Sequence, residues 1–118
     1  MQVTTGLSDA VSRYLDMTSA ELKLTAGNMA NVDTPGYRTQ GFNFEQEMMR
    51  AMQAPLDAPL TPNVSAVDGL VSRPDGNNVS MDRESMQLAK EQLQFRFGVT
   101  VLRSEFTRVM SAIHAEAK

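Results

Sequence analysis

Few residues in this chain could carry out chemistry. His114 is the only histidine and falls near the end of a predicted helix, where a charged ring would complement the helix dipole. The chain has no cysteine, so disulfide and thiolate chemistry are excluded. With one histidine and no cysteine, the usual zinc sites cannot be assembled.

The acidic residues nearest to a basic one do not form a reaction centre. Glu45 and Glu47 lie two positions apart near Arg50 and fit the solvated face of a short helix. No glycine-rich phosphate loop is present, and no nucleophile stands beside a base. The sequence therefore predicts a protein that is not an enzyme, with no cofactor and no catalytic or metal-binding residues.

Length and charge further limit the classes of protein to which this chain could belong. The chain has 118 residues, with 11 basic and 14 acidic side chains, which suits one domain and argues against binding to nucleic acid. No stretch approaches the roughly 18 apolar residues of a membrane helix, so no direct membrane insertion is expected. Residues 1–9 contain neither a basic cluster nor an apolar run, so we expect no cleaved signal peptide.

The elements that must position the remaining residues are mainly helical. The first segment, residues 1–32, is predicted to hold a helix over residues 8–31, with Ser8 and Asp9 as capping side chains. One face of this helix alternates in steps of four and three, as in a coiled coil. Its members are Val11, Leu15, Thr18, Leu22, Thr25, Met29 and Val32.

The last segment, residues 80–118, predicts a stronger helix over residues 80–115, capped by Ser80 or Asp82. Its coiled-coil seam contains Gln92 and seven apolar residues: Leu88, Phe95, Val99, Leu102, Phe106, Val109 and Ile113. A second row, Leu93, Phe97 and Val101, runs beside the seam. We expect the seam to pack on the first helix and the second row to face neighbouring molecules. Gly98 would cost about 1 kcal/mol relative to Ala, so it marks either a close helix approach or simple tolerance.

The middle segment, residues 33–79, contains all five prolines. It predicts a short helix over residues 44–53, a turn at Arg73-Pro-Asp-Gly76 and otherwise irregular chain, and no alternating run is long enough to predict a sheet. The fold class is accordingly mainly α, with long terminal helices paired as a coiled coil around a largely irregular, Pro/Gly-rich middle. Because the last helix is longer than the first, part of it should overhang.

The stretch Asn28-Met-Ala-Asn-Val-Asp-Thr-Pro-Gly-Tyr37 ends the first helix. Thr34-Pro35-Gly36-Tyr37 has the chemistry of a type II turn, with proline second and glycine third. Asn31 is expected to take the left-handed conformation that stops a helix. Tyr37 offers a ring and a hydroxyl to fix the loop. By itself, this is a rigid helix stop.

The same stretch resembles the signature of the flagellar rod and hook proteins. The matching residues are Asn28, Ala30, Asn31, Thr34, Pro35, Gly36 and Tyr37, with Arg38 following. Gly41-Phe-Asn-Phe44, Asn77-Asn-Val-Ser-Met-Asp-Arg-Glu84 and Gln92-Leu-Gln-Phe95 are similar to further stretches of proximal rod subunits of the FlgB type. The chain is shorter than is usual in that family, which indicates a reduced central segment.

This resemblance implies a structural subunit of the proximal rod in the flagellar basal body. Its partners would be other rod subunits, the rod–MS-ring junction protein and copies of itself, and its terminal helices would form an inner coiled-coil layer. Export would proceed unfolded through the flagellar type III apparatus, without a cleaved signal peptide. Phe44 and Met48 fit the docking signal for the export gate, although the same pair also fits one face of a short helix.

Two other functions remain compatible with the sequence. A soluble coiled-coil adaptor or export chaperone would form a closed dimer or bundle, and another axial subunit of the rod or hook would share the turn signature. An amphipathic helix that binds a membrane surface is disfavoured, because acidic residues are interspersed along the polar faces.

Overall fold

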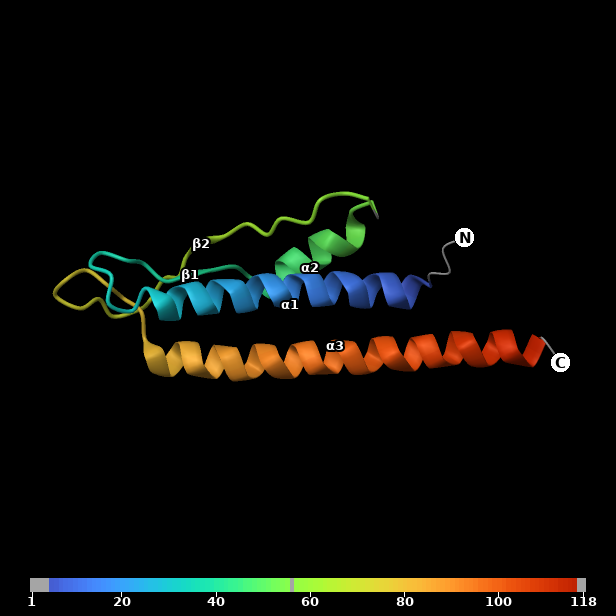
Figure 1. Cartoon of the computed structure of the whole chain (residues 1–118). Helices are drawn as coiled ribbons and strands as arrows, with labels where there is room; N and C mark the ends of the chain where they lie inside the picture. The colour runs from blue at the N-terminus through green and yellow to red at the C-terminus, as the bar shows by residue number, and fades with distance from the viewer. Residues whose placement is uncertain (1–4, 56, 117–118) are drawn as a thin grey trace.

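The structure is a computed structural model that describes residues 5–55 and 57–116. Two long helices lie side by side and antiparallel, and the short helix and both strands lie on the side of α1 away from α3 (Figure 1). The molecule is elongated, about 70 Å in its longest dimension. The elements in chain order are α1 (Gly6–Ala30), β1 (Gln40–Gly41), α2 (Phe44–Gln53), β2 (Ser65–Ala66) and α3 (Met81–Glu116).

The helix starts follow from their capping side chains. The hydroxyl of Thr5 accepts a hydrogen bond from the Ser8 amide, and the Ser8 hydroxyl accepts one from the Thr5 amide. This reciprocal capping box satisfies two amides at the free end of α1. The predicted start at residue 8 was therefore two residues late, because Ser8 is the third helical residue and Thr5 is the cap. Ser80 caps α3 as predicted, accepting from the Arg83 amide.

The middle segment is more ordered than its composition suggests. The predicted short helix is confirmed as α2, and Asn43 caps it by accepting from the Gln46 amide. The guanidinium of Arg13, buried on α1, donates to the carbonyl of Ala51 in the last turn of α2. This contact ties α2 to α1. The segment also holds a short sheet that the sequence did not predict: β1 and β2 pair antiparallel, with Gln40 opposite Ala66.

The face that α3 turns toward α1 differs from the predicted seam. The buried residues of α3 recur every seven positions and form an inner row: Glu84, Glu91, Gly98 and Glu105. Opposite them on α1 lie the buried Val11, Thr18 and Thr25, also seven apart. The interface thus has a largely polar centre line, whereas the prediction placed an apolar seam there.

The predicted seam residues flank this inner row. Phe95, Phe106 and Ile113 are exposed, Phe106 by 66% of its surface, so they do not pack fully on α1. Leu88, Val99, Leu102 and Val109 are half-buried. The prediction that the seam buries itself against α1 was wrong for the three exposed members. The apolar periodicity of α3 indicates an apolar face that is wider than one partner helix can cover.

Gly98 lies at a close approach of the two helices. A methyl group built on Gly98 would lie 2.7 Å from Cδ2 of Leu15 and 3.1 Å from Cδ1 of Tyr14. The close-approach explanation for this glycine is therefore confirmed. Beyond this point Glu105 accepts a hydrogen bond from Thr5 at the start of α1, and residues 106–116 of α3 extend past that start (Figure 1). The predicted overhang is present.

Candidate functional site

The side chain of Asn28 is almost fully buried and uses its whole hydrogen-bonding capacity. Its amide donates to the carbonyl of Gln40 at 2.9 Å and to the Glu84 carboxylate at 3.2 Å. Its oxygen accepts from the Tyr37 hydroxyl and from the Gln40 amide, both at 3.0 Å. An asparagine has two donors and two acceptor positions, so none is left unpaired. Asn28 thereby joins α1, the turn, β1 and α3.

Asn77, in the motif that leads into α3, plays the corresponding role. Its side-chain amide donates to the carbonyls of Asn31 and Thr34, at 2.9 and 2.8 Å. Its side-chain oxygen accepts from the Val79 amide at 2.8 Å. Because carbonyls at a helix end lack intrahelical partners, Asn77 supplies donors that the end of α1 needs.

The predicted turn is present. The Tyr37 amide donates to the Thr34 carbonyl, and Gly36 has a φ of 76°, as the third position of a type II turn requires. The Arg73–Gly76 turn is also confirmed, with its own hydrogen bond and a φ of 86° at Gly76. Gly36 and Gly76 pack together, since a methyl group on Gly76 would lie 3.4 Å from the Cα of Gly36.

Asn31 does not take the left-handed conformation that the sequence led us to expect. Its φ is −102°, and its side-chain amide donates to the Gly27 carbonyl at 2.8 Å instead. The side-chain oxygen of Asn31 accepts from the Thr34 hydroxyl. The helix stop therefore comes from these local hydrogen bonds and from Asn77, and the glycine with positive φ lies further along at Gly36.

The two sequence motifs, which lie far apart along the chain, meet in one place. We call this contact the motif junction. Its pairs are Asn28 with Glu84, Asn31 and Thr34 with Asn77, Gly36 with Asp75, and Tyr37 with Asn78. The remaining motif residues Ala30 and Pro35 are exposed, and the Arg38 guanidinium donates to the Ser72 hydroxyl. The motif junction fixes how the middle segment leaves α1 and returns to α3.

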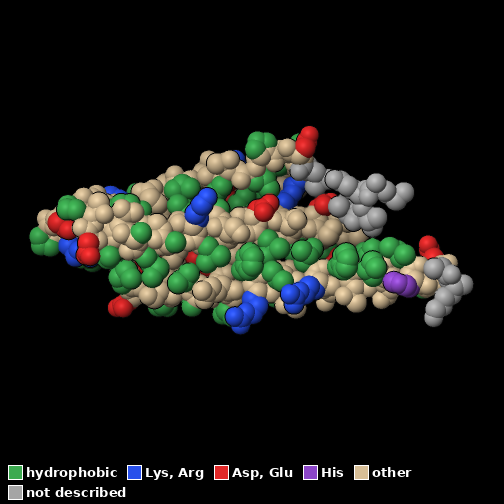
Figure 2. Space-filling view, in the orientation of Figure 1, with side chains coloured by type: hydrophobic (Ala, Val, Ile, Leu, Met, Phe, Trp, Pro, Cys, Tyr) green, Lys and Arg blue, Asp and Glu red, His purple; other side chains and the backbone are tan. Residues whose placement is uncertain are grey.

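The second candidate site is the apolar surface of α3. Hydrophobic side chains gather along α3 and between it and α1 (Figure 2). We call the seven apolar seam residues, Leu88, Phe95, Val99, Leu102, Phe106, Val109 and Ile113, the α3 stripe. Leu93 and Phe97 of the second row are 66% and 64% exposed, and Val101 is half-buried. Soluble chains seldom leave so many large apolar side chains open along one element.

The inner row supplies a third feature, a ladder of buried carboxylates. Thr25 donates to Glu91 at 2.8 Å, and Thr5 donates to Glu105 at 2.9 Å. Burial raises the pKa of Glu91, and burial together with the nearby Glu91 carboxylate raises the pKa of Glu21 to about 7, against the opposing effect of Lys90. Carboxylates are rarely buried without partners. Sequence reasoning missed these glutamates because it searched for apolar residues at the helix interface.

The other sequence candidates lie apart from these sites. Phe44 and Met48 are half-buried on α2, where the Phe44 ring packs edge-on against Tyr14 at 5.5 Å between centroids. His114 is exposed near the end of α3, and its ring contacts the Met110 carbonyl. Among residues 5–55 and 57–116, no helix is long and apolar enough to cross a membrane.

Comparison with known proteins decides between the functions that the sequence left open. The chain is 30% identical over 129 residues to the flagellar basal body rod protein FlgB of Salmonella typhimurium, and the match covers 89% of this chain and 94% of that protein. The chain belongs to the FlgB family of flagellar basal body rod proteins. The FlgB proteins of Escherichia coli and Borrelia hermsii are 28% and 27% identical to it, over 91% and 86% of this chain. No family model matches the chain.

Membership in the FlgB family makes this protein a structural subunit of the flagellar basal body rod, and favours that function over a free adaptor. The alignment also bears on length. Its 129 positions exceed the 118 residues of the chain, so the Salmonella FlgB protein contains residues that this chain lacks. The reduced central segment stays a prediction.

Proposed function

We propose that the chain is a proximal rod subunit that joins its neighbours through the α3 stripe. The observation that carries this proposal is the exposure of Phe95, Phe106 and Ile113 on a helix that is already paired with α1. Segments 1–32 and 80–118 would form the coiled-coil packing layer, and segment 33–79 would brace them through the motif junction. The α3 stripe would complete its burial only against helices of adjacent subunits.

The energetics favour assembly over an isolated chain. Burying a large apolar side chain stabilises by roughly 1.5–3 kcal/mol relative to leaving it exposed. Phe106 and Ile113 lie on the part of α3 that extends past the start of α1, so their burial requires another molecule or a segment outside the described residues. Because the same contact repeats from one subunit to the next, the assembly gains this burial free energy many times.

The partners follow from the same surface. We propose other rod subunits, the rod–MS-ring junction protein and copies of this chain as the molecules that cover the α3 stripe and the second row. These two surfaces lie on opposite flanks of the inner row, so one copy can present one flank while its neighbour presents the other. Contacts between unlike surfaces that do not close into a ring produce helical assemblies.

The Phe44 and Met48 pair fits a role in export. We propose that the chain leaves the cytoplasm unfolded through the flagellar type III apparatus, without a cleaved signal peptide, and joins the rod that spans the periplasm, and that Phe44 and Met48 dock at the export gate. In the folded chain both side chains are half-buried, so the signal would be available only before folding. After export the same pair would pack α2 on α1.

The test is the Phe106→Asp variant, expressed in the source bacterium in place of the native chain. Phe106 is 66% exposed, so the substitution should leave the helix intact while placing a charge in the apolar contact. We expect export to continue but incorporation into purified hook–basal bodies, measured by quantitative mass spectrometry, to fall at least tenfold.

The matched control is Thr107→Asp, which adds the same charge at the next exposed residue of α3, outside the stripe. This variant should incorporate nearly as well as the native chain. Normal incorporation of Phe106→Asp would show that the α3 stripe does not face a neighbour in the rod. Equal loss in both variants would point to a general effect of charge on α3.

A further inference from the structure

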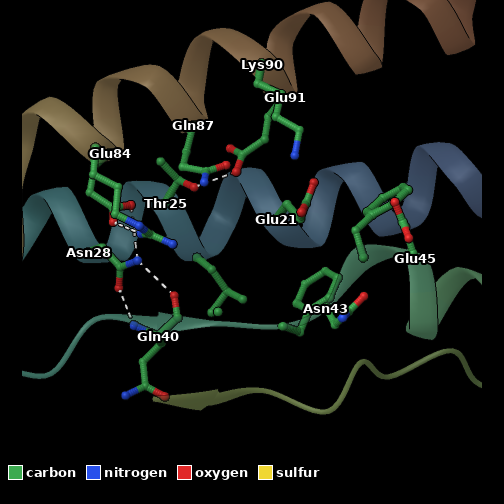
Figure 3. A pocket seen from close by; sticks show the side chains of 15 residues that line it. Glu21, Thr25, Asn28, Gln40, Asn43, Glu45, Glu84, Gln87, Lys90 and Glu91 are labelled. Atoms are coloured by element: carbon green, nitrogen blue, oxygen red, sulfur yellow. Dashed lines mark hydrogen bonds and ion pairs between the residues drawn. The ribbon is translucent and has the colours of Figure 1, made fainter. Parts of the chain in front are cut away.

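A polar pocket of about 370 Å³ lies between α1, α3 and the chain that runs from β1 into α2 (Figure 3). Carboxylates reach it from three elements: Glu21 on α1, Glu45 on α2, and Glu84 and Glu91 on α3. Arg83 and Lys90 also line it. The pocket lies beside the motif junction, and the proposed assembly contact does not use it.

Two carboxylate oxygens in this pocket have no hydrogen-bond partner among residues 5–55 and 57–116. Glu91 is only 3% exposed; its Oε1 accepts from Thr25, but its Oε2 is buried and makes no hydrogen bond. The Oε2 of Glu21 is likewise buried without a partner. Glu84, in contrast, is satisfied by Arg83 and Asn28. A buried oxygen without a donor is costly, so once both carboxylates are ionised this pocket lacks a donor at two defined places.

The missing partner should be a cation with several donors. Lys90 is exposed at the pocket edge, and among the described residues it forms no ion pair with either glutamate. The same residues contain no group of three acidic side chains placed around one point for a metal ion. A guanidinium group offers five N–H donors in a planar fork and can bridge two carboxylates. The donor requirement therefore fits an arginine side chain.

The chain itself carries arginines of the required kind. Arg96 and Arg103 are exposed on α3, seven residues apart, and form no ion pair among the described residues. At about 100° per residue, they lie about 150° round the helix from the inner row, whereas Gln87 and Lys90 of the pocket lie about 50° and about 110° from it on the other flank. Figure 2 shows basic side chains along the outer edge of α3. The pocket and these arginines of one molecule therefore cannot meet.

We propose that this pocket is a socket for an arginine, Arg96 or Arg103, from α3 of a second copy of the chain. The inference rests on the proposed function in one respect, namely that copies lie next to each other in the rod. The arginine would donate to the free oxygens of Glu21 and Glu91. One copy would offer the pocket flank of α3 and the next its outer face, so the contact joins unlike surfaces and can repeat without closing.

The absence of native cysteine makes disulfide trapping a clean test. Two tagged chains are co-expressed in cells that lack the native chain: one carries Glu45→Cys at the pocket rim, and the other carries Thr100→Cys, between Arg96 and Arg103. Both arginines stay in place. After mild oxidation we expect mixed dimers in purified basal bodies, and at least fivefold fewer when Thr100→Cys is replaced by Ser19→Cys on the exposed side of α1.

Removing or reversing the charges at the proposed contact tests whether the arginine and the glutamates hold the two chains together. Adding Glu21→Gln and Glu91→Gln to the pocket chain, or Arg96→Glu and Arg103→Glu to the other, should lower the mixed-dimer yield at least fivefold. Unchanged yields in these variants would overturn the arginine socket. If both tagged chains are present in the particles but no mixed dimer forms, the socket is also overturned, while the rod function stands.

A second measurement does not depend on assembly. N-acetyl-arginine amide is titrated into the full purified chain while the amide NMR signals of Asn43 and Gln87 are followed. Saturable shifts are expected in the native chain and should be absent from the Glu21→Gln, Glu91→Gln variant, whose fold is checked by thermal unfolding. No saturable shift in the native chain, or equal shifts in the variant, would contradict the socket.

Discussion

The side-chain amide of Asn28 donates to the carboxylate of Glu84 across 56 positions of sequence, at 3.2 Å in a buried setting. One residue closes the N-terminal helix and the other lies in the first turn of the C-terminal helix. Each belongs to one of the two motifs that resemble rod proteins. Their contact explains why both motifs occur in one chain, because neither half of the motif junction is satisfied without the other.

The first prediction concerns this contact. Asn28→Ala removes four hydrogen bonds, one of them to the buried carboxylate of Glu84 and two to the part-buried backbone of Gln40. Because an unsatisfied buried group costs about 1–3 kcal/mol, we expect the free energy of unfolding to fall by about 2–3 kcal/mol. Urea unfolding followed by circular dichroism measures the change. Asn63→Ala, at an exposed position, is the control and should change the free energy by less than about 0.5 kcal/mol. A similar small change in Asn28→Ala would contradict the role of the motif junction.

The second prediction concerns the helix approach at Gly98. Gly98→Val puts a branched side chain where Cδ2 of Leu15 already lies 2.7 Å from a single added carbon. We expect the helices to separate locally and the unfolding free energy to fall by about 1–3 kcal/mol, as overpacked sites do. Thermal unfolding compares it with Ser104→Val, at an exposed position of the same helix. Since valine is a better helix former than glycine, a variant that becomes more stable would show that propensity outweighs the close approach.

The third prediction concerns pH. The pKa of Glu21 is raised to about 7 in the folded chain, mainly by burial and then by Glu91, from an ordinary value of 4.5. Lys90 opposes this effect, while Glu84 and Arg83 act in addition on Glu91. The folded state thus binds a proton that the unfolded state has lost, so this group's contribution to stability is largest below pH 4.5 and falls as the pH rises through 7.

Glu21→Gln removes that dependence, because the amide stays neutral at every pH. We expect the variant to melt at a higher temperature than the native chain at pH 8 and at nearly the same temperature at pH 5. Glu45→Gln, an exposed position at the edge of the same pocket, serves as control and should behave like the native chain. Parallel pH profiles for Glu21→Gln and the native chain would show that Glu21 is ionised in the folded state throughout this range.

The fourth prediction separates the two roles of Phe44. Its ring packs on Tyr14 in the folded chain, whereas the proposed export signal acts before folding. Phe44→Ala should lower export severalfold, measured as the amount of chain outside the cytoplasm. Tyr14→Ala, which removes the other half of the same aromatic contact, should leave export near its native level. If both variants are exported equally, Phe44 serves the fold and not the gate.

Several features of the fold could be predicted from the sequence because local physics decides them. The bounds of α2 follow from its cap at Asn43 and its amphipathic period, and the turn at Gly36 follows from the Thr-Pro-Gly order. The prediction failed where a non-local partner decides the outcome. Asn31 ends α1 without positive φ because Asn77, 46 positions away in sequence, supplies donors to the end of the helix.

The sequence by itself determined that two long helices flank a Pro-rich middle, that α3 has an apolar face wider than one partner needs, and that the motifs resemble rod proteins. Only the tertiary structure decided which face of α3 meets α1. Hydrophobic periodicity locates the centre of the apolar face of a helix. In a subunit that uses part of this face to bind neighbours, the centre of the face does not have to point at the subunit's own partner helix. The line turned to α1 therefore holds Glu84, Glu91, Gly98 and Glu105, which a search for apolar residues passes over.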